Sequence, residues 1–145
     1  MNDCLIWIAD DDKEDLDLIE QAFNECSFKV RIFDAEESRN IVSVLLNTEQ
    51  KRLPQLILLD INMPVISGKE LLQLIKKHHR LKHIPIAIFT TSNSKREKLE
   101  CLELGANCFL TKPYDFRSMI KICSALSTVF CTAEFDGRKS YLSVL

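Results

Sequence analysis

The stretch Gln55–Asp60 reads QLILLD, four large aliphatic side chains followed at once by a carboxylate. A continuous apolar run of this length is typical of a strand that is buried on both faces, as strands are in parallel sheets. Pro54 precedes the run, where its missing N–H does no harm to a sheet. Four other short runs are also predicted to be strands: Leu5–Ala9, Lys29–Ala35, Ile84–Phe89 and Cys108–Thr111.

Longer amphipathic segments separate these runs and are predicted to be helices, because their apolar residues recur at helical spacing. Parallel strands need crossover connections, and these helices would supply them. The chain is therefore predicted to be an α/β protein with a doubly wound, five-stranded parallel sheet. The expected helices are Lys13–Cys26, Glu36–Asn47, a third capped by Ser67 and ending near His79, Lys95–Leu104, and a fifth capped by Asp115 and ending near Phe130.

Polar side chains follow four of the predicted strands directly. The first strand ends in three aspartates, residues 10–12, and the third ends in Asp60. The fourth is followed by Thr90 and the fifth by Lys112. The carboxyl ends of parallel strands share one edge of the sheet, and ligands bind at that edge. We therefore expect these side chains to meet in one site.

The chemistry of this set points to a metal ion and a phosphoryl group. Two carboxylates about 4 Å apart repel by roughly 4 kcal/mol at an effective dielectric near 20. A hard divalent cation removes that repulsion, and an all-oxygen donor set suits Mg²⁺. Lys112 and Thr90 would supply a charge and a hydrogen bond to an incoming phosphoryl group, which is mainly what phosphoryl transfer requires.

Taken together, these residues resemble bacterial two-component response-regulator receiver domains, among them single-domain chemotaxis receivers. The resemblance covers about residues 4–131 and implies a flavodoxin-like (βα)5 fold with strand order 2-1-3-4-5. The stretch 90–92 and the stretch 78–83 also resemble the receiver subgroup that partners phytochrome-type histidine kinases. The motifs that carry the resemblance are Ile8-Ala9-Asp10-Asp11-Asp12, Leu58 to Pro64 followed by Gly68, Phe89-Thr90-Thr91, and Gly105-Ala106 followed by Phe109 and Lys112-Pro113.

The resemblance implies a role for each acidic residue. Asp60 corresponds to the phosphoryl acceptor. Asp11 and Asp60, with the backbone carbonyl of Asn62, correspond to Mg²⁺ ligands, and Asp10 corresponds to a residue that acts through water or as a second ligand of the acidic pair. Asp12 extends the acidic pair and is interpreted as a helix cap rather than a ligand.

The remaining motif residues correspond to the phosphoryl contact and the switch. Lys112 and Thr90 would contact the phosphoryl group, and Thr90 and Phe109 would form the switch pair. A cis Lys112–Pro113 bond, as in family members, would aim the lysine inward. Two positions depart from the commonest pattern: Phe109 replaces a tyrosine, and Thr91 is larger than the usual alanine or serine. Gly68 and Gly105 are expected to serve turns or close approaches.

The implied function is phosphoryl relay. A sensor histidine kinase or histidine phosphotransfer protein would donate a phosphoryl group to Asp60, and the protein would catalyse its own phosphorylation and dephosphorylation without being a turnover enzyme. Output would pass to a downstream protein through the face formed by Lys95–Leu104, Cys108–Thr111 and the last helix, with a homodimer as an open alternative.

Two other function classes compete with this hypothesis. A haloacid-dehalogenase-type phosphohydrolase needs a second aspartate two positions after the nucleophile, and Asn62 stands there instead. A receiver-like interaction module that is never phosphorylated would typically lack an acid, the hydroxyl or the lysine, and this chain keeps them all. A zinc site that uses His78, His79 and His83 has no closed ligand spacing.

Composition bounds the remaining possibilities. The chain has 145 residues and a formal net charge of −2, which gives no electrostatic reason to bind nucleic acid or an anionic membrane. With no membrane-length apolar run and no signal-peptide pattern, a cytoplasmic protein is expected.

Residues 1–131 are predicted to form the domain and 132–145 a short tail, with no effector domain. The six cysteines, scattered without a C-x-x-C pair, are interpreted as reduced, buried side chains rather than disulfides.

Overall fold

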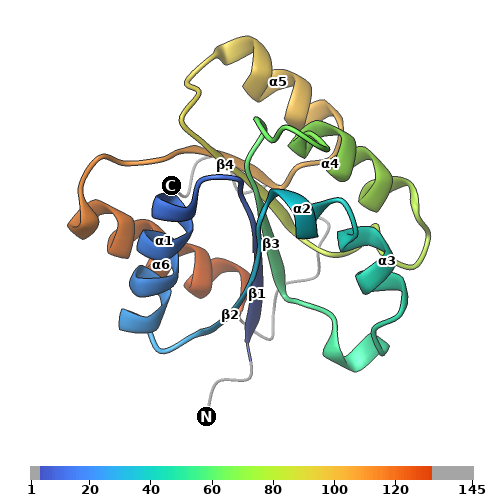
Figure 1. Cartoon of the computed structure of the whole chain (residues 1–145), viewed down its shortest axis with the longest axis horizontal. Helices are drawn as coiled ribbons and strands as arrows, with labels where there is room; N and C mark the ends of the chain where they lie inside the picture. Colours follow the sequence, from blue (N-terminus) through green and yellow to red (C-terminus); the bar gives the residue numbers. More distant parts are fainter. Residues whose placement is uncertain (1–3, 132–145) are drawn as a thin grey trace.

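A computed structural model describes residues 4–131, which form one five-stranded parallel sheet with helices on both faces (Figure 1). The strand order is β2-β1-β3-β4-β5, so the predicted fold class and topology are confirmed. The predicted tail, residues 132–145, lies outside the described part. The strands are β1 (Leu5–Ala9), β2 (Lys29–Phe33), β3 (Leu56–Leu59), β4 (Ile86–Thr90) and β5 (Cys108–Thr111).

Helices cover the sheet in two layers. Helices α1 (Lys13–Glu25) and α6 (Phe116–Phe130) pack side by side on one face. The opposite face is covered by α2 (Ala35–Ser38), α3 (Ile41–Leu46), α4 (Gly68–Lys77) and α5 (Lys95–Glu103). Each face carries its own apolar cluster, because alternate side chains of the buried strands point to opposite sides.

Side chains of the expected types begin the helices. Asp12 accepts hydrogen bonds from the N–H groups of Glu14 and Asp15, which confirms its interpretation as the cap of α1. Ser67 caps α4 and Asp115 caps α6 in the same way. These caps fix where each chain segment turns away from the sheet edge. None of the described helices has the length and apolar character that a bilayer crossing requires.

The second predicted helix, Glu36–Asn47, is broken into α2 and α3, so the single-helix prediction is wrong. Asp34 and Glu37 form a capping box that begins α2 one residue earlier than predicted. The Ser38 hydroxyl donates to the backbone carbonyls of Phe33 and Asp34, and the helical bond from the Ser38 N–H to the Asp34 carbonyl is also present. A short 3₁₀ turn, η1 (Gln50–Arg52), was also not predicted.

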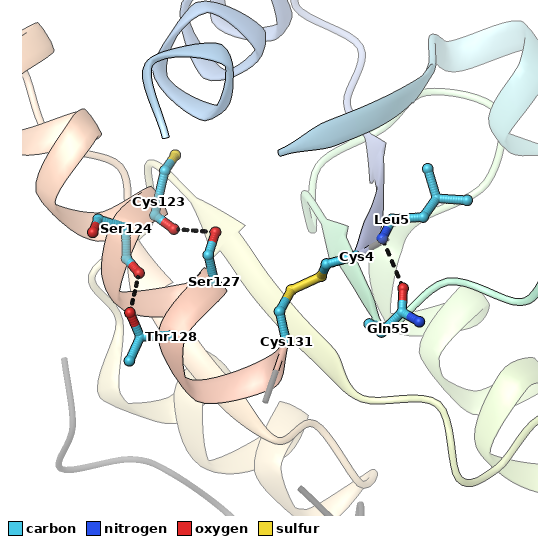
Figure 2. Close-up of a disulfide and its surroundings, with 8 residues drawn as sticks. All are labelled: Cys4, Leu5, Gln55, Cys123, Ser124, Ser127, Thr128 and Cys131. Atoms are coloured by element: carbon cyan, nitrogen blue, oxygen red, sulfur yellow. Dashed lines mark hydrogen bonds between the residues drawn. A yellow bond between two sulfur atoms is a disulfide. The ribbon is translucent and has the colours of Figure 1, made fainter. Parts of the chain in front are cut away.

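The prediction that no cysteine forms a disulfide is wrong for one pair. Cys4, next to the start of β1, is bonded to Cys131 at the end of α6 (Figure 2). Their Cα atoms lie 5.6 Å apart, within the range that a disulfide spans. The two residues are separated by 127 positions, so only the folded chain brings them together. The other four cysteines are free, and Cys101, Cys108 and Cys123 are buried as predicted.

Lys76 ties the end of α4 to two neighbouring segments. Its ammonium donates to the carbonyls of Lys82 and Ile84 and to the side-chain oxygen of Asn107. Burial lowers the pKa of Lys76 to about 8, whereas the three acceptor oxygens favour its charged form. Gly105 leaves room for this lysine: it has φ +108°, and a Cβ there would lie 3.1 Å from Lys76 Cγ. The glycine thus serves both a turn and a close approach, as predicted.

Replacing Lys76 with methionine keeps the aliphatic stem but removes the donor to three oxygens, two of them in partly buried hydrogen bonds. We expect K76M to lower the free energy of unfolding by about 1–3 kcal/mol. The matched control is K77M on the exposed side of the same helix, which should change it by less than about 0.5 kcal/mol. Urea unfolding followed by circular dichroism measures both. Equal stability of the two variants would contradict the role given to Lys76.

Reducing the Cys4–Cys131 bond removes a restraint that closes a loop of more than 100 residues. We expect reduction to lower the free energy of unfolding by about 2–5 kcal/mol. Thermal unfolding with and without a phosphine reductant tests this, with Cys131→Ser as the control. A wild-type melting curve that does not respond to the reductant, or a Cys131→Ser curve that does, would rule the stabilising disulfide out.

Candidate functional site

The backbone ladder of the sheet continues one residue past several strands and so positions the polar residues that follow. The Asp10 N–H donates to the Phe33 carbonyl, and the Asp60 N–H donates to the Ala9 carbonyl. The Lys112 N–H likewise donates to the carbonyl of Thr90. These residues are therefore held by the rigid sheet rather than by free loops.

Their side chains meet at the carboxyl edge of the sheet, although they come from distant parts of the chain. Asp10, Asp60 and Lys112 are each less than one tenth exposed. The Lys112 ammonium lies 2.5 Å from Asp10 Oδ2 and 3.4 Å from Asp60 Oδ2. The fold thus brings together side chains that lie up to 102 positions apart, as predicted.

A fourth member of this cluster was missed from the sequence. Asp15, in the first turn of α1, places its Oδ2 2.7 Å from the Lys112 ammonium. Its position one turn after the strand-end aspartates was the available signal. That signal is weak, because the same turn also carries the acidic residue Glu14. We refer to Asp10, Asp15, Asp60 and Lys112 as the carboxylate–lysine cluster.

The pKa values of Asp10 and Lys112 are both raised, but for different physical reasons. Burial raises the pKa of Asp10 to about 6, although the hydrogen bond from Lys112 and the Asp12 N–H act against this. Burial alone would lower the pKa of Lys112. Its hydrogen bonds to Asp10 and Asp15, with the charges of Asp10 and Asp60, raise that pKa above its ordinary value instead. The lysine is thus a fixed positive charge at neutral pH.

Three carboxylates form a possible cation site beside this lysine. One oxygen from each of Asp10, Asp11 and Asp60 lies within 4.8 Å of the others. Asp11 is exposed, so the group opens to solvent on its side. Within residues 4–131 this is the single group of three or more acidic, histidine or cysteine side chains that could hold a metal ion, so the histidines considered for zinc do not form one. Asn62 lies exposed two residues beyond Asp60.

The two residues predicted to form the switch lie on adjacent strands. Thr90 is fully buried at the end of β4, and its hydroxyl oxygen accepts a hydrogen bond from the Ser92 N–H. Phe109 on β5 is buried in the apolar cluster under α4 and α5. Its register partner is Ile88, two residues before Thr90. The aromatic ring therefore occupies the inward position in this structure.

The predicted cis bond between Lys112 and Pro113 is wrong, because the described chain contains no cis peptide bond. A trans bond suffices to aim the lysine inward. Thr111 faces solvent, and the alternation along the chain sends the next side chain, that of Lys112, into the protein. The trans form is also the intrinsically favoured one before proline.

Gly68 holds the loop after Asp60 in place. Its N–H donates to the Ile61 carbonyl at 2.9 Å, so the start of α4 folds back onto the end of β3. A Cβ at this position would overlap the carbonyl oxygen of Asp60 and approach the Ile61 Cα. Only glycine allows this contact, which confirms the expected close approach.

With this geometry established, comparison with known proteins identifies the family. The family model described as the response regulator receiver domain matches residues 6–124. The chain belongs to this family. Receiver domains take phosphoryl groups from histidine kinases, and the protein is therefore a phosphoryl-accepting response regulator.

Two sequence relatives cover most of this receiver domain. Response regulator Rcp1 of Synechocystis sp. is 28% identical over 127 residues, covering 86% of both chains. The probable methanogenesis regulatory protein FilR2 of Methanothrix harundinacea is 30% identical over 117 residues, covering 79% of this chain and 76% of its own. Both matches run along most of the receiver domain rather than through a single motif.

Solved structures agree with the fold. The Mn²⁺-bound form of response regulator Rcp1 matches with TM-score 0.76 and 26% identity, covering 91% of this chain and 97% of that one. The phosphorylated cyanobacterial phytochrome response regulator RcpA matches with TM-score 0.77 and 26% identity, covering 91% and 96%. The receiver domain is thus similar to one response regulator solved with a metal ion bound and to another solved in its phosphorylated form.

The contact at Gly68 leads to a prediction for the receiver domain. We expect Gly68→Ala to lower the free energy of unfolding by about 1–3 kcal/mol, because the new methyl group must displace the Asp60 backbone. Lys77→Ala, exposed later on α4, is the control and should have little effect. Denaturant unfolding gives the stability, and the amide NMR shifts of residues 60 and 61 report the displacement. Unchanged shifts in Gly68→Ala would contradict the close contact.

Proposed function

We propose that Asp60 is the phosphoryl acceptor of this receiver domain. The supporting observation is its place beside Lys112: the carboxylate is almost fully buried and faces a permanently charged ammonium 3.4 Å away. In the transfer, an Asp60 oxygen would form a bond to phosphorus while the bond from phosphorus to the donor's histidine nitrogen breaks. Lys112 would stabilise the negative charge on the transferred oxygens, which is the main demand of this chemistry.

A divalent cation fits the three carboxylates Asp10, Asp11 and Asp60, and we propose Mg²⁺ as that ion. The donors are all oxygens, which suits a hard cation, and the exposure of Asp11 leaves room for water and a phosphoryl oxygen. The Asn62 backbone carbonyl is the proposed fourth protein ligand. When bound, the ion would neutralise the carboxylates and polarise the phosphoryl oxygens. The Mn²⁺-bound structure of Rcp1 supports a divalent cation in a related protein.

The role of Lys112 depends on how its contacts are shared. In this structure its two shorter contacts go to Asp10 and Asp15 and its longer one to Asp60. Asp15 thus helps to hold the ammonium beside the acceptor without occupying the acceptor itself. The raised pKa of Lys112 keeps it protonated, so that it donates hydrogen bonds to the phosphoryl oxygens and takes no proton from the reaction.

We further propose that Thr90 and Phe109 convert phosphorylation into a change of surface. To donate a hydrogen bond to a phosphoryl oxygen, the Thr90 side chain would move away from the Ser92 N–H, whose bond it now accepts, and this would shift the β4–α5 loop. Phe109 lies two residues before the exposed end of β5 and would repack in response. A bistable packing of this kind amplifies a small local shift.

The proposed output face consists of α5, β5 and α6, which correspond to the fourth helix, fifth strand and fifth helix of the sequence prediction. Large apolar side chains are exposed there, namely Leu99 on α5 and Tyr114 and Phe116 where α6 begins. Such side chains are favoured at protein interfaces. A downstream protein is the proposed partner and a homodimer the alternative. The likeness to RcpA, a phytochrome response regulator by its description, supports a phytochrome-type histidine kinase as donor. A cytoplasmic location stays a prediction.

Incubation with acetyl phosphate and Mg²⁺ tests the acceptor directly. We expect intact-mass spectrometry to show a gain of one phosphoryl group in the wild type, lost when EDTA replaces Mg²⁺. The Asp60→Asn variant should show no adduct. Asp17→Asn, on the exposed side of α1, is the matched control and should be labelled like wild type. An undiminished adduct in Asp60→Asn would place the phosphoryl group elsewhere and overturn the proposal.

A further inference from the structure

A second polar site lies near the opposite edge of the sheet from the carboxylate–lysine cluster. Two adjoining cavities of about 400 Å³ and about 460 Å³ share Leu5 and Arg52 as lining residues. Leu5 and Lys29 begin their strands, and Gln55 directly precedes β3, so the cavities lie toward the amino ends of the strands. We call the two cavities together the basic hollow. Its size is that of a small-molecule site.

The hollow is positively charged although the whole chain has a net charge of −2. Four cations line it: Lys29 and Arg31 from β2 and Lys51 and Arg52 from η1. Glu49 is the acidic residue of the lining, and its contact with Lys51 is exposed and long, at 3.8 Å. Among the described residues, Lys29, Arg31 and Arg52 form no ion pair. The local charge is therefore left without a partner.

A buried hydrogen-bond donor in the wall also lacks a partner. Trp7 lines the hollow and is 1% exposed. Its indole Nε1–H is the one buried side-chain nitrogen or oxygen in the described part of the chain that has no hydrogen-bond partner. Buried polar groups are nearly always paired in folded proteins, so this donor is an exception among the described side chains.

Arg31 is pre-arranged to bind an oxyanion. Its guanidinium carbon lies 5.0 Å from the ring centroids of both Trp7 and Phe33. These aromatic rings, themselves 5.0 Å apart, restrict the guanidinium while its N–H edges remain available. A restricted guanidinium offers two parallel donors to a carboxylate or phosphate and loses little entropy on binding.

We propose that the basic hollow is a binding site for a small organic anion, with its carboxylate or phosphate group on Arg31 and Arg52 and its apolar part against Leu5 and Trp7. Trp7 lines the hollow, so a bound ligand changes the surroundings of its indole ring. Lys29 extends the positive charge toward solvent and draws the anion in. The site is independent of Asp60 and adds a small-molecule input to the receiver domain at the far edge of its sheet.

The single tryptophan of the chain makes the test direct, because Trp7 gives one indole N–H signal in a ¹H–¹⁵N spectrum. The labelled protein, in buffer from which divalent ions have been removed, is titrated with phenyl phosphate, benzoate and inorganic phosphate against sodium chloride of equal ionic strength. We expect saturable shifts of the Trp7 indole signal with the two organic anions. Arg31→Gln should weaken the binding of phenyl phosphate about tenfold, as should Arg52→Gln.

Two controls separate this site from the proposed phosphorylation site. Lys121→Gln, an exposed charge on α6, and Asp60→Asn should both bind phenyl phosphate like wild type. Three outcomes would overturn the proposal: shifts that sodium chloride reproduces, shifts that survive unchanged in both arginine variants, or inorganic phosphate binding as tightly as phenyl phosphate. The last would mean that the apolar wall contributes nothing and that an organic anion is not the ligand.

Discussion

The buried ammonium of Lys112 lies among three carboxylates that come from separate parts of the chain. Asp10 follows β1, Asp60 follows β3, Asp15 belongs to α1, and the lysine itself follows β5. Burying these charges costs desolvation energy, so each of them needs the others in place. The sheet provides that placement, since its hydrogen-bond ladder continues into the residues that carry the charges. The edge of the sheet is thereby both the polar centre of the domain and its site of chemistry.

The same cluster explains why this edge suits phosphoryl transfer. Three carboxylates share one lysine, so the site carries surplus negative charge. A divalent cation at Asp10, Asp11 and Asp60 would neutralise that charge before a phosphoryl group arrives. Asp60, the proposed acceptor, has the longest of the three contacts to the lysine, whereas Asp10 and Asp15 lie closer to the ammonium. The basic hollow has the opposite character. It lies toward the amino ends of the strands, where unpaired cations rather than carboxylates line the surface.

The strands and the strand-end residues could be predicted because each signal is local: an apolar run, then a polar residue. Asp10, Asp60, Thr90 and Lys112 were identified in this way, and parallel topology alone brought them together. Asp15 was missed because its role depends on the path of a lysine about one hundred residues away. The break between α2 and α3 was missed because helical spacing does not reveal it. The disulfide could not be predicted because it depends on tertiary structure, which brings the end of α6 beside the start of β1.

The Cys4–Cys131 bond makes the described domain a covalent ring, with only the extreme ends of the chain outside it. A protease that cuts one surface loop within this ring produces no separate fragments, because both pieces stay attached through the sulfur bridge. A nicked molecule of this kind keeps its strands at high effective concentration and is able to re-form its sheet. The disulfide also holds Cys4 and Cys131 side by side, so a domain fused to either end would be attached to the same side of the receiver domain.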